Sequence, residues 1–322
     1  MTVMRTLWMA ALTLLSILAN GQNDPLFSHY MFNPSYYNPG WLGDVQSSFA
    51  VVQYRSQWVG YSTTLDGDGG APTSQLMSFA IPVNGFLKTA GLNIVNDQVG
   101  AETIMKAQVA IAYATHFEKG TLSFGLAPGL VSRTLDGSRF RPENPGDPVI
   151  PTGRETQAKP DAQVGVFYST FSGFFGGVSM DHILSPSLIR IDATNAQSQG
   201  KLLPVYYFHG GKKMSLNRDT ELTPTFLLRS TAGGYSMDVS GVLNYRSTMW
   251  TGLSYRSAES IVLLIGYSFL ENKELKVGYS FDYVVQNQEA KRPTSHEIFI
   301  RYDLPSLILG GRKAVKTPRF SF

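Results

Sequence analysis

The chain has 322 residues, 43% of them hydrophobic, with 31 Gly, 19 Phe, 16 Tyr, 4 Trp, no Cys and a formal net charge of +3. This length allows one large domain or two ordinary ones. The lack of Cys excludes disulfide bonds, thiolate metal sites and a cysteine nucleophile.

The first residues have the pattern of a secretory signal. Leu7–Ala19 is the only long apolar run, and it is too short to cross a bilayer as a helix. Arg5 precedes it, and small residues follow at a spacing that suits a signal-peptidase site before Gln22. We therefore expect residues 1–21 to be removed and the mature chain to be exported.

Residues 22–46 are the least strand-like part of the mature chain. Asn-Pro occurs twice in this segment, and proline both favours turns and removes a hydrogen-bond donor that a strand needs. Two interpretations remain open: a lead-in packed at the periplasmic mouth of a barrel built from the residues that follow, or a plug inside that barrel. The residues assigned to this motif are Phe27, Tyr30, Met31, Asn33, Pro34, Asn38 and Pro39.

From residue 47 onward the sequence alternates apolar with small or polar residues, most clearly in Met249–Val284. Successive side chains of a strand point to opposite faces, so this period predicts strands between two different environments. Runs of about ten residues suit tilted strands that cross a bilayer, and aromatic residues flank the apolar face as in a membrane girdle. We predict an all-β fold, a transmembrane antiparallel β-barrel over residues 47–304. Its fourteen or so strands are expected at 47–57, 75–82, 89–96, 103–115, 120–131, 161–169, 172–181, 203–213, 219–230, 235–245, 248–257, 260–269, 273–284 and 295–303.

The connections between these strands alternate in length. Those after even strands are short, whereas the three longest, Gln57–Ser74, Ser132–Pro160 and His182–Leu202, follow odd strands. Bacterial outer-membrane barrels have short periplasmic turns and long outer loops. The pattern therefore predicts an outer-membrane protein with both termini in the periplasm.

Charged residues within the strands fall on the face that carries Gly and Ser. A charge that faces lipid at mid-bilayer costs about 2–4 kcal/mol, whereas a charge in the lumen can be solvated or paired. We assign to the lumen the charges of Arg256, Lys276, Asp282 and Arg301. A lumen of this size is too wide for wall side chains alone to fill, so we expect it to hold a plug or water.

Residues 305–322 form a basic tail with Arg312, Lys313, Lys316 and Arg319. Loss of Arg5 with the signal leaves a net charge of +2, and the four tail cations leave −2 for residues 22–311. The positive charge therefore belongs to the tail and gives no reason to expect nucleic-acid binding. The tail is either a solvated periplasmic end or a contact for an acidic partner surface.

Signals for catalysis or metal binding are weak. Asp181-His182 is an acid–histidine pair at the expected outer rim, and a barrel hydrolase there is a minor alternative, because adjacent strand residues point in opposite directions. Asp66 and Asp68 suggest calcium, but the residues after them lack the other ligands of the calcium-loop pattern. We expect no catalytic residues, no metal site and no cofactor.

Two clusters at the expected outer end contain aromatic and polar residues that we expect to be exposed. They contribute Arg55, Gln57 and Trp58 after the first strand, and Asp97 and Gln98 at a tight connection. Membrane girdle and turn residues would explain them, but Trp and Arg also act as anchors in protein interfaces. We therefore name them as candidate partner contacts.

Several segments resemble the PorP/SprF family of type IX secretion outer-membrane proteins. They are "DPLFSHYMFNPSYYNP" (24–39), "YRSQWVG" (54–60), "GLNIVNDQVGAE" (91–102), "LKVGYSFDY" (275–283) and "SHEIFIRYDL" (295–304). The resemblance runs from Asp24 to about Leu304. Gly40-Trp41 departs from it, because the family tends to have Ala-Tyr there.

The resemblance implies a FadL-like barrel in the outer membrane of a Gram-negative, Bacteroidetes-type bacterium, with roles in type IX protein secretion and gliding motility. It implies two kinds of partner besides lipid: a secreted substrate such as a surface adhesin, and periplasmic type IX components that include a peptidoglycan-binding lipoprotein. It implies no catalysis. The alternative is a passive channel or a FadL-like transporter of small or hydrophobic molecules.

Overall fold

The computed structural model describes residues 24–61, 70–83, 85–139, 153–192, 195–286 and 291–304. The expected signal, the Asp66 and Asp68 loop and the basic tail lie outside these residues. No helix in the described part of the chain is both long and apolar enough to cross a membrane.

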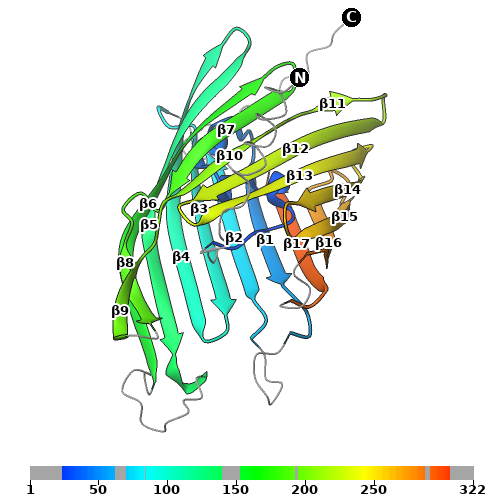
Figure 1. The fold of residues 1–322 in the computed structure, drawn as a ribbon. Helices are drawn as coiled ribbons and strands as arrows, with labels where there is room; N and C mark the ends of the chain where they lie inside the picture. Colours follow the sequence, from blue (N-terminus) through cyan, green and yellow to red (C-terminus); the bar gives the residue numbers. More distant parts are fainter. Residues whose placement is uncertain are drawn as a thin grey trace, which may run out of the picture.

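Fourteen antiparallel strands form a closed barrel (Figure 1), as predicted. Strands adjacent in the chain pair with each other, β7 pairs with β10, β10 pairs with β12, and β17 closes the barrel against β1. The barrel strands are β1 (Ser48–Ser56), β2 (Thr73–Pro82), β3 (Thr89–Val99), β4 (Glu102–Phe117), β5 (Gly120–Asp136), β6 (Arg154–Thr170), β7 (Phe174–Asp181), β10 (Val205–Lys212), β12 (Thr220–Thr231), β13 (Gly234–Tyr245), β14 (Met249–Arg256), β15 (Ser260–Phe269), β16 (Leu275–Val284) and β17 (Thr294–Leu304). The short strand β11 (Met214–Ser215) follows β10 in the chain and, like β10, pairs with β12.

Two differences from the predicted strands occur at one end of the barrel. β5 and β6 run several residues beyond the predicted ranges and pair with each other along that extension. A hairpin of β8 (Ser187–Asp192) and β9 (Asn195–Lys201) occupies a connection where no strand was predicted. These segments lie outside the apolar band, and neither of their faces meets lipid. Their residues therefore need not alternate between apolar and polar as those of a membrane strand do.

The barrel wall has an apolar outer face and a polar inner face. On β14, Leu253 is 63% exposed, whereas its neighbours Ser254 and Arg256 point inward and are buried. The apolar side chains of β15, Ile261, Leu263 and Ile265, are exposed in the same way. This exposed band is the surface that lipid covers in a membrane barrel.

The four longest connections between barrel strands, 57–72, 137–153, 182–204 and 285–293, all lie at one end. Because long loops are extracellular in bacterial barrels, we call this the outer end and the opposite end periplasmic.

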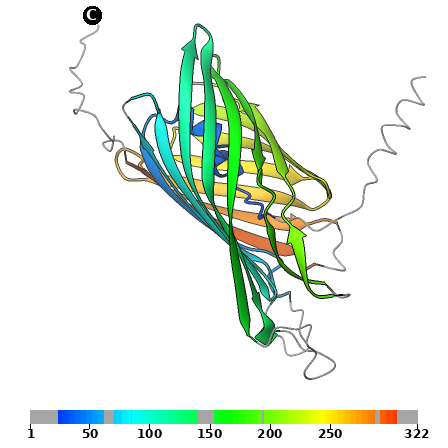
Figure 2. The same ribbon diagram turned by 90° about the vertical axis from the view of Figure 1, so that its left-hand side faces the viewer.

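Residues 24–44, which we call the plug, lie inside the barrel (Figure 2). They contain three short 3-10 helices, η1 (Tyr30–Phe32), η2 (Pro34–Tyr36) and η3 (Pro39–Asp44). Proline begins both η2 and η3, a position where its missing N–H has no partner to lose. The Asn38 side chain caps η3 by accepting a hydrogen bond from the amide of Gly40 at 2.8 Å. Of the two positions considered for this segment, the structure shows the one inside the lumen.

The hydrophobic core lies between the plug and the wall. Leu42 of the plug packs in a cluster with the wall residues Phe49, Trp250 and Phe299. Tyr36 and Tyr37 pack with Tyr207 on the other side of the lumen. The plug therefore supplies the apolar contacts that a second sheet would supply in a sandwich.

Candidate functional site

Wall side chains bind the backbone of the plug. A segment of short turns leaves many N–H and C=O groups without partners, and these groups are costly to bury unpaired. The wall provides their partners through Arg229 to the Asp24 carbonyl (2.6 Å), Glu297 to the amides of Ser28 (2.6 Å) and His29 (3.0 Å), Arg301 to the Phe32 carbonyl (3.1 Å), Asn93 to the Ser35 carbonyl (3.2 Å), and Gln163 (2.8 Å) and Ser179 (2.5 Å) to the Tyr37 carbonyl. The plug is thus held as an internal ligand of the lumen.

A first group of buried charges lies beside the junction of β1 and β17, and we call it the seam network. It consists of His29, Arg55, Asp238, Arg256, Asp282 and Glu297, each at most 2% exposed. The closest contacts are Arg55 Nη2 to Asp282 Oδ2 at 2.7 Å, Arg256 Nε to Asp238 Oδ1 at 2.8 Å, and His29 Nδ1 to Glu297 Oε1 at 2.8 Å. Ser28 adds a hydroxyl that donates to Asp282 at 2.9 Å. Hydrogen bonds from Ser28 and His29 therefore join the plug to the buried ion pairs of the wall.

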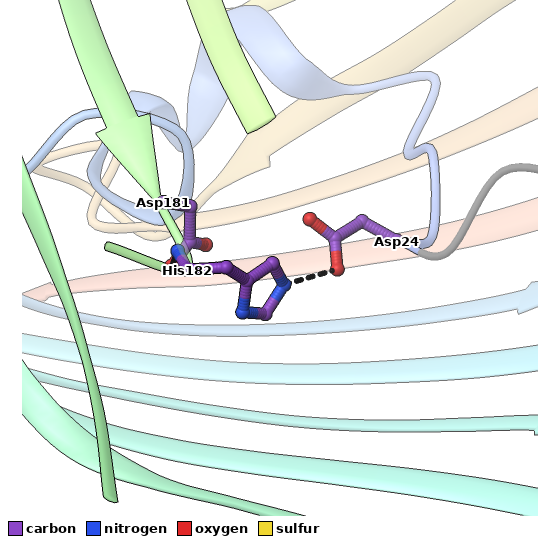
Figure 3. Close-up of side chains that lie close together, drawn as sticks. All are labelled: Asp24, Asp181 and His182. Atoms are coloured by element: carbon purple, nitrogen blue, oxygen red, sulfur yellow. Dashed lines mark hydrogen bonds and ion pairs between the residues drawn. The ribbon is translucent and has the colours of Figure 1, made fainter. Parts of the chain in front are cut away.

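A second group lies at the outer end of β7, and we call it the latch network: Asp24, Lys106, Asp161, Asp181, His182 and Tyr207. Its centre is the His182 ring, whose Nε2 is 3.1 Å from Asp24 Oδ1 of the plug (Figure 3). The Nδ1 of the same ring pairs with Asp161 of β6. Lys106 pairs with Asp181, and the Tyr207 hydroxyl donates to Asp24 Oδ2 at 3.0 Å.

The charges of the latch network reinforce one another. Burial alone would lower the pKa of His182, but the charges of Asp24 and Asp181 and the bond with Asp161 raise that pKa to about 10. Burial would raise the pKa of Asp24, but His182 and Lys106 hold it well below its usual range. The Asp24 contribution to stability is full above pH 3.8 and is lost as the pH falls. The His182 contribution is full below pH 6.5 and is lost as the pH rises toward 10.

The latch network also has the spacing of a metal site, since one ligand atom each from Asp24, Asp181 and His182 lies within 4.8 Å of the others. However, a metal needs a neutral imidazole nitrogen, and both His182 nitrogens face carboxylates that keep the ring protonated. Lys106 already neutralises Asp181. These contacts describe an ion-pair network rather than a metal centre.

The same contacts bear on a hydrolase centred on His182. A catalytic triad places one carboxylate and one nucleophilic hydroxyl on the two ring nitrogens. Here both nitrogens meet carboxylates, Asp161 and Asp24. The geometry is that of a buried cation between two anions.

The assigned lumen charges all point inward. Arg256 and Asp282 belong to the seam network, and nearer the periplasmic end Lys276 and Arg301 pair with Asp303 at 2.6 and 2.8 Å. The plug residues named from the sequence are buried, except for Met31, which is half-buried.

The candidate partner contacts separate into two groups. Arg55 is 1% exposed and belongs to the seam network instead of the outer surface, because it alternates along β1 with the outward-facing Tyr54. Gln57, Trp58, Asp97 and Gln98 are partly exposed at the outer end. Trp58 packs against Tyr61, and the Lys291 ammonium lies 5.2 Å from its ring centre.

The sequence did not single out Asp24, Lys106, Asp161 or Arg229. The sequence does contain a signal for Lys106, which shares the inward face of β4 with Gln108 and Ala110. A buried lysine among small and polar residues requires an anionic partner. The partners themselves could not be read from the chain.

Glycines in the wall make room for the plug backbone. A Cβ placed at Gly125 would lie 2.1 Å from the Pro39 carbonyl carbon, and one at Gly165 would lie 2.0 Å from Asn38 Oδ1. Such distances are far below contact, so any side chain at Gly125 must displace the plug.

We therefore expect Gly125→Leu to destabilise the folded barrel by about 1–3 kcal/mol, as other overpacked sites do, and to expose the plug to protease. The unfolding midpoint in urea and limited proteolysis measure both effects. Gly241→Leu is the matched control, because a Cβ at Gly241 has nothing within 4 Å. Equal midpoints for the two variants would contradict the steric argument.

A closed antiparallel barrel with an apolar outer band, a charged lumen and a bound N-terminal segment defines an outer-membrane β-barrel that carries its own plug. The chain matches the family of the type IX secretion system membrane protein PorP/SprF over residues 19–302 and belongs to that family. It is therefore an outer-membrane component of type IX secretion, as the resemblance implied.

No curated protein matches the sequence. Solved structures with a similar fold include the toluene transporter TbuX of Ralstonia pickettii, at 12% identity and a TM-score of 0.51, over 90% of this chain and 96% of that one. The monoaromatic hydrocarbon channel CymD has 12% identity and a TM-score of 0.52, over 89% and 95%. A FadL homologue of Pseudomonas aeruginosa has 15% identity and a TM-score of 0.47, over 88% and 96%. At these identities the likeness concerns the fold alone.

Proposed function

We propose that this protein is a plugged, non-enzymatic docking component of the type IX machinery. Its outer loops would hold a secreted surface protein such as an adhesin, and its basic tail would contact periplasmic components, including a peptidoglycan-binding lipoprotein. The observation that carries the proposal is the filled lumen, in which two buried networks of ion pairs and hydrogen bonds bind the plug to the wall. With the lumen occupied, the parts available for partners are the loops and the termini.

The plug fits the wall closely. One cavity between them, bordered by Tyr30, Met31 and Tyr37 of the plug and by Phe226 of the wall, measures about 20 Å³. That volume holds about one water molecule. This pocket is too small to hold a transported molecule, which supports docking over transport.

The second candidate is a passive channel or a transporter of small or hydrophobic molecules. The fold shared with the toluene transporter TbuX and the channel CymD favours it. Against it, the inner wall beside the plug carries the charged side chains of Arg55, Lys106 and Asp181, and such a lining offers little apolar surface to a hydrophobic molecule.

The family also supports a Bacteroidetes-type bacterium as the source and gliding motility as a process that this protein serves.

Affinity capture of the protein from solubilised membranes of a producing strain tests the docking role. We expect it to recover a large secreted protein together with a periplasmic type IX component. Replacing the outer connection 137–153 by a short turn should lose the secreted protein, whereas ending the chain at residue 311 should lose the periplasmic one. Each truncated form is the control for the other, and recovery of neither partner by the intact protein would contradict the proposal.

A further inference from the structure

The β8–β9 hairpin lies beside β5 and β6 at the outer end of the barrel (Figure 1), and β8 contacts both strands. Its Leu188 and the following Leu202 pack with Val131 and Ile104, which point into the barrel. Leu188 is fully buried and Leu202 nearly so. The base of the hairpin is thus packed against the inner face of the wall.

The chain enters this hairpin through a tight turn. His182 and Ser185 have φ values of 53° and 45°, a backbone conformation that few non-glycine residues adopt. The turn is tied to β6 by the Ile183 amide, which donates to the Ala162 carbonyl at 3.1 Å. The base of the hairpin is closed by the Leu202 amide, which donates to the Pro186 carbonyl at 3.0 Å. The position of the hairpin therefore depends on the residues that hold this turn.

His182 is the side chain at that turn, and the plug provides one of its two partners. Its ring lies between Asp161 of β6 and Asp24 of the plug, with 2% of the side chain exposed. The Asp24 carboxylate accepts a hydrogen bond from the Tyr207 hydroxyl of β10, and the Asp24 backbone carbonyl accepts one from Arg229 of β12. If the first plug residues withdrew while the rest of the plug stayed seated, His182 would keep only Asp161 as a ring partner. Removing one partner from a buried ion pair is costly, so the turn would then favour conformations in which His182 reaches water.

We propose that the Asp24–His182 contact is a latch that couples the plug to the outer hairpin: the seated plug holds the base of β8–β9 against the wall, and withdrawal of the first plug residues frees it. A contact shared by two elements couples their equilibria in both directions. A partner that binds the released hairpin more tightly than the held one thereby weakens the hold on the plug, and a factor that moves the plug changes the outer surface. The latch goes beyond the docking role and does not depend on which partner binds.

Hydrogen exchange of the complete protein in detergent, read by mass spectrometry over residues 187–201, tests the latch. Asp24→Asn keeps the size of the side chain but removes its charge, so we expect amide exchange in the hairpin to quicken about tenfold, the effect of losing one charge-assisted hydrogen bond. Tyr207→Phe removes only the hydroxyl that binds Asp24 and should give a smaller increase in the same peptides.

Asp44→Asn is the matched control, because it makes the same change in the plug at the periplasmic end, where Asp44 accepts from Ser169 at 2.8 Å. It should leave the hairpin unchanged. Equal exchange in the hairpin for Asp24→Asn and Asp44→Asn would overturn the latch. So would an increase spread evenly over β14–β16, since that would report a general loosening of the barrel.

Discussion

Deletion of residues 24–44 is expected to turn a closed barrel into an ion-conducting pore. The wall that the plug covers carries Arg55, Lys106, Asp181 and Glu297, all inward and buried only because the plug excludes water. Once exposed, these groups will be hydrated, and a lumen of this width will fill with water and ions. This is the largest functional change that a single segment of the chain can produce.

Single-channel recording in planar bilayers measures the effect. The complete protein should give no steady conductance, whereas the deleted form should give stable current steps. Asp44→Asn, which keeps the plug, should behave as the complete protein does. Gel mobility before and after heating establishes the folded fraction, and a folded, deleted barrel without conductance would contradict the expectation. An open complete protein would instead favour the channel function.

The second large effect is expected for Arg256→Met in the seam network. Arg256 pairs with Asp238 at 2.8 Å and reaches Asp282 at 3.4 Å, and its side chain is 1% exposed. Removal of one partner from a buried ion pair leaves an uncompensated charge and costs about 3–5 kcal/mol. We expect a shift of that size in the free energy of unfolding in urea, with the barrel refolded in lipid vesicles.

Arg301→Met is the matched control, since Arg301 is 15% exposed and its partner Asp303 also pairs with Lys276. Its effect should be clearly smaller. The double variant with Arg256→Met and Asp238→Leu should recover part of the loss, because no unpaired carboxylate remains at Asp238. If the single variant is no worse than Arg301→Met, the buried ion pairs of the seam network do not stabilise the barrel.

The alternation of the sequence was sufficient to predict the barrel. In β14–β16 lipid on one side and the lumen on the other impose opposite polarity on successive residues, so strands of the correct number and order could be read directly. Alternation did not predict the outer halves of β5 and β6 or the β8–β9 hairpin. There neither face of the strand meets lipid, so the residues need not alternate.

The contacts between side chains in the lumen could not be predicted from the sequence. Alternation shows that Lys106 and Asp282 point inward, but the register and curvature of the closed barrel decide which inward groups meet. Asp24 and His182, which lie 158 residues apart, are an example. His182 was noticed for its neighbour Asp181, yet its ring partners are Asp24 and Asp161. Arg55 was placed at the rim because its cluster ends a strand, although its own position in the alternation faces inward.

The junction between the first and last strands has a consequence for biogenesis. Arg55 of β1 lies directly opposite Glu297 of β17, so the cylinder cannot close until β17 has been made. The Glu297 carboxylate receives the backbone amides of Ser28 and His29 at that junction. Without the plug, Glu297 would lose the two amides that it binds. We therefore expect the seam to close more favourably when the plug already occupies the interior.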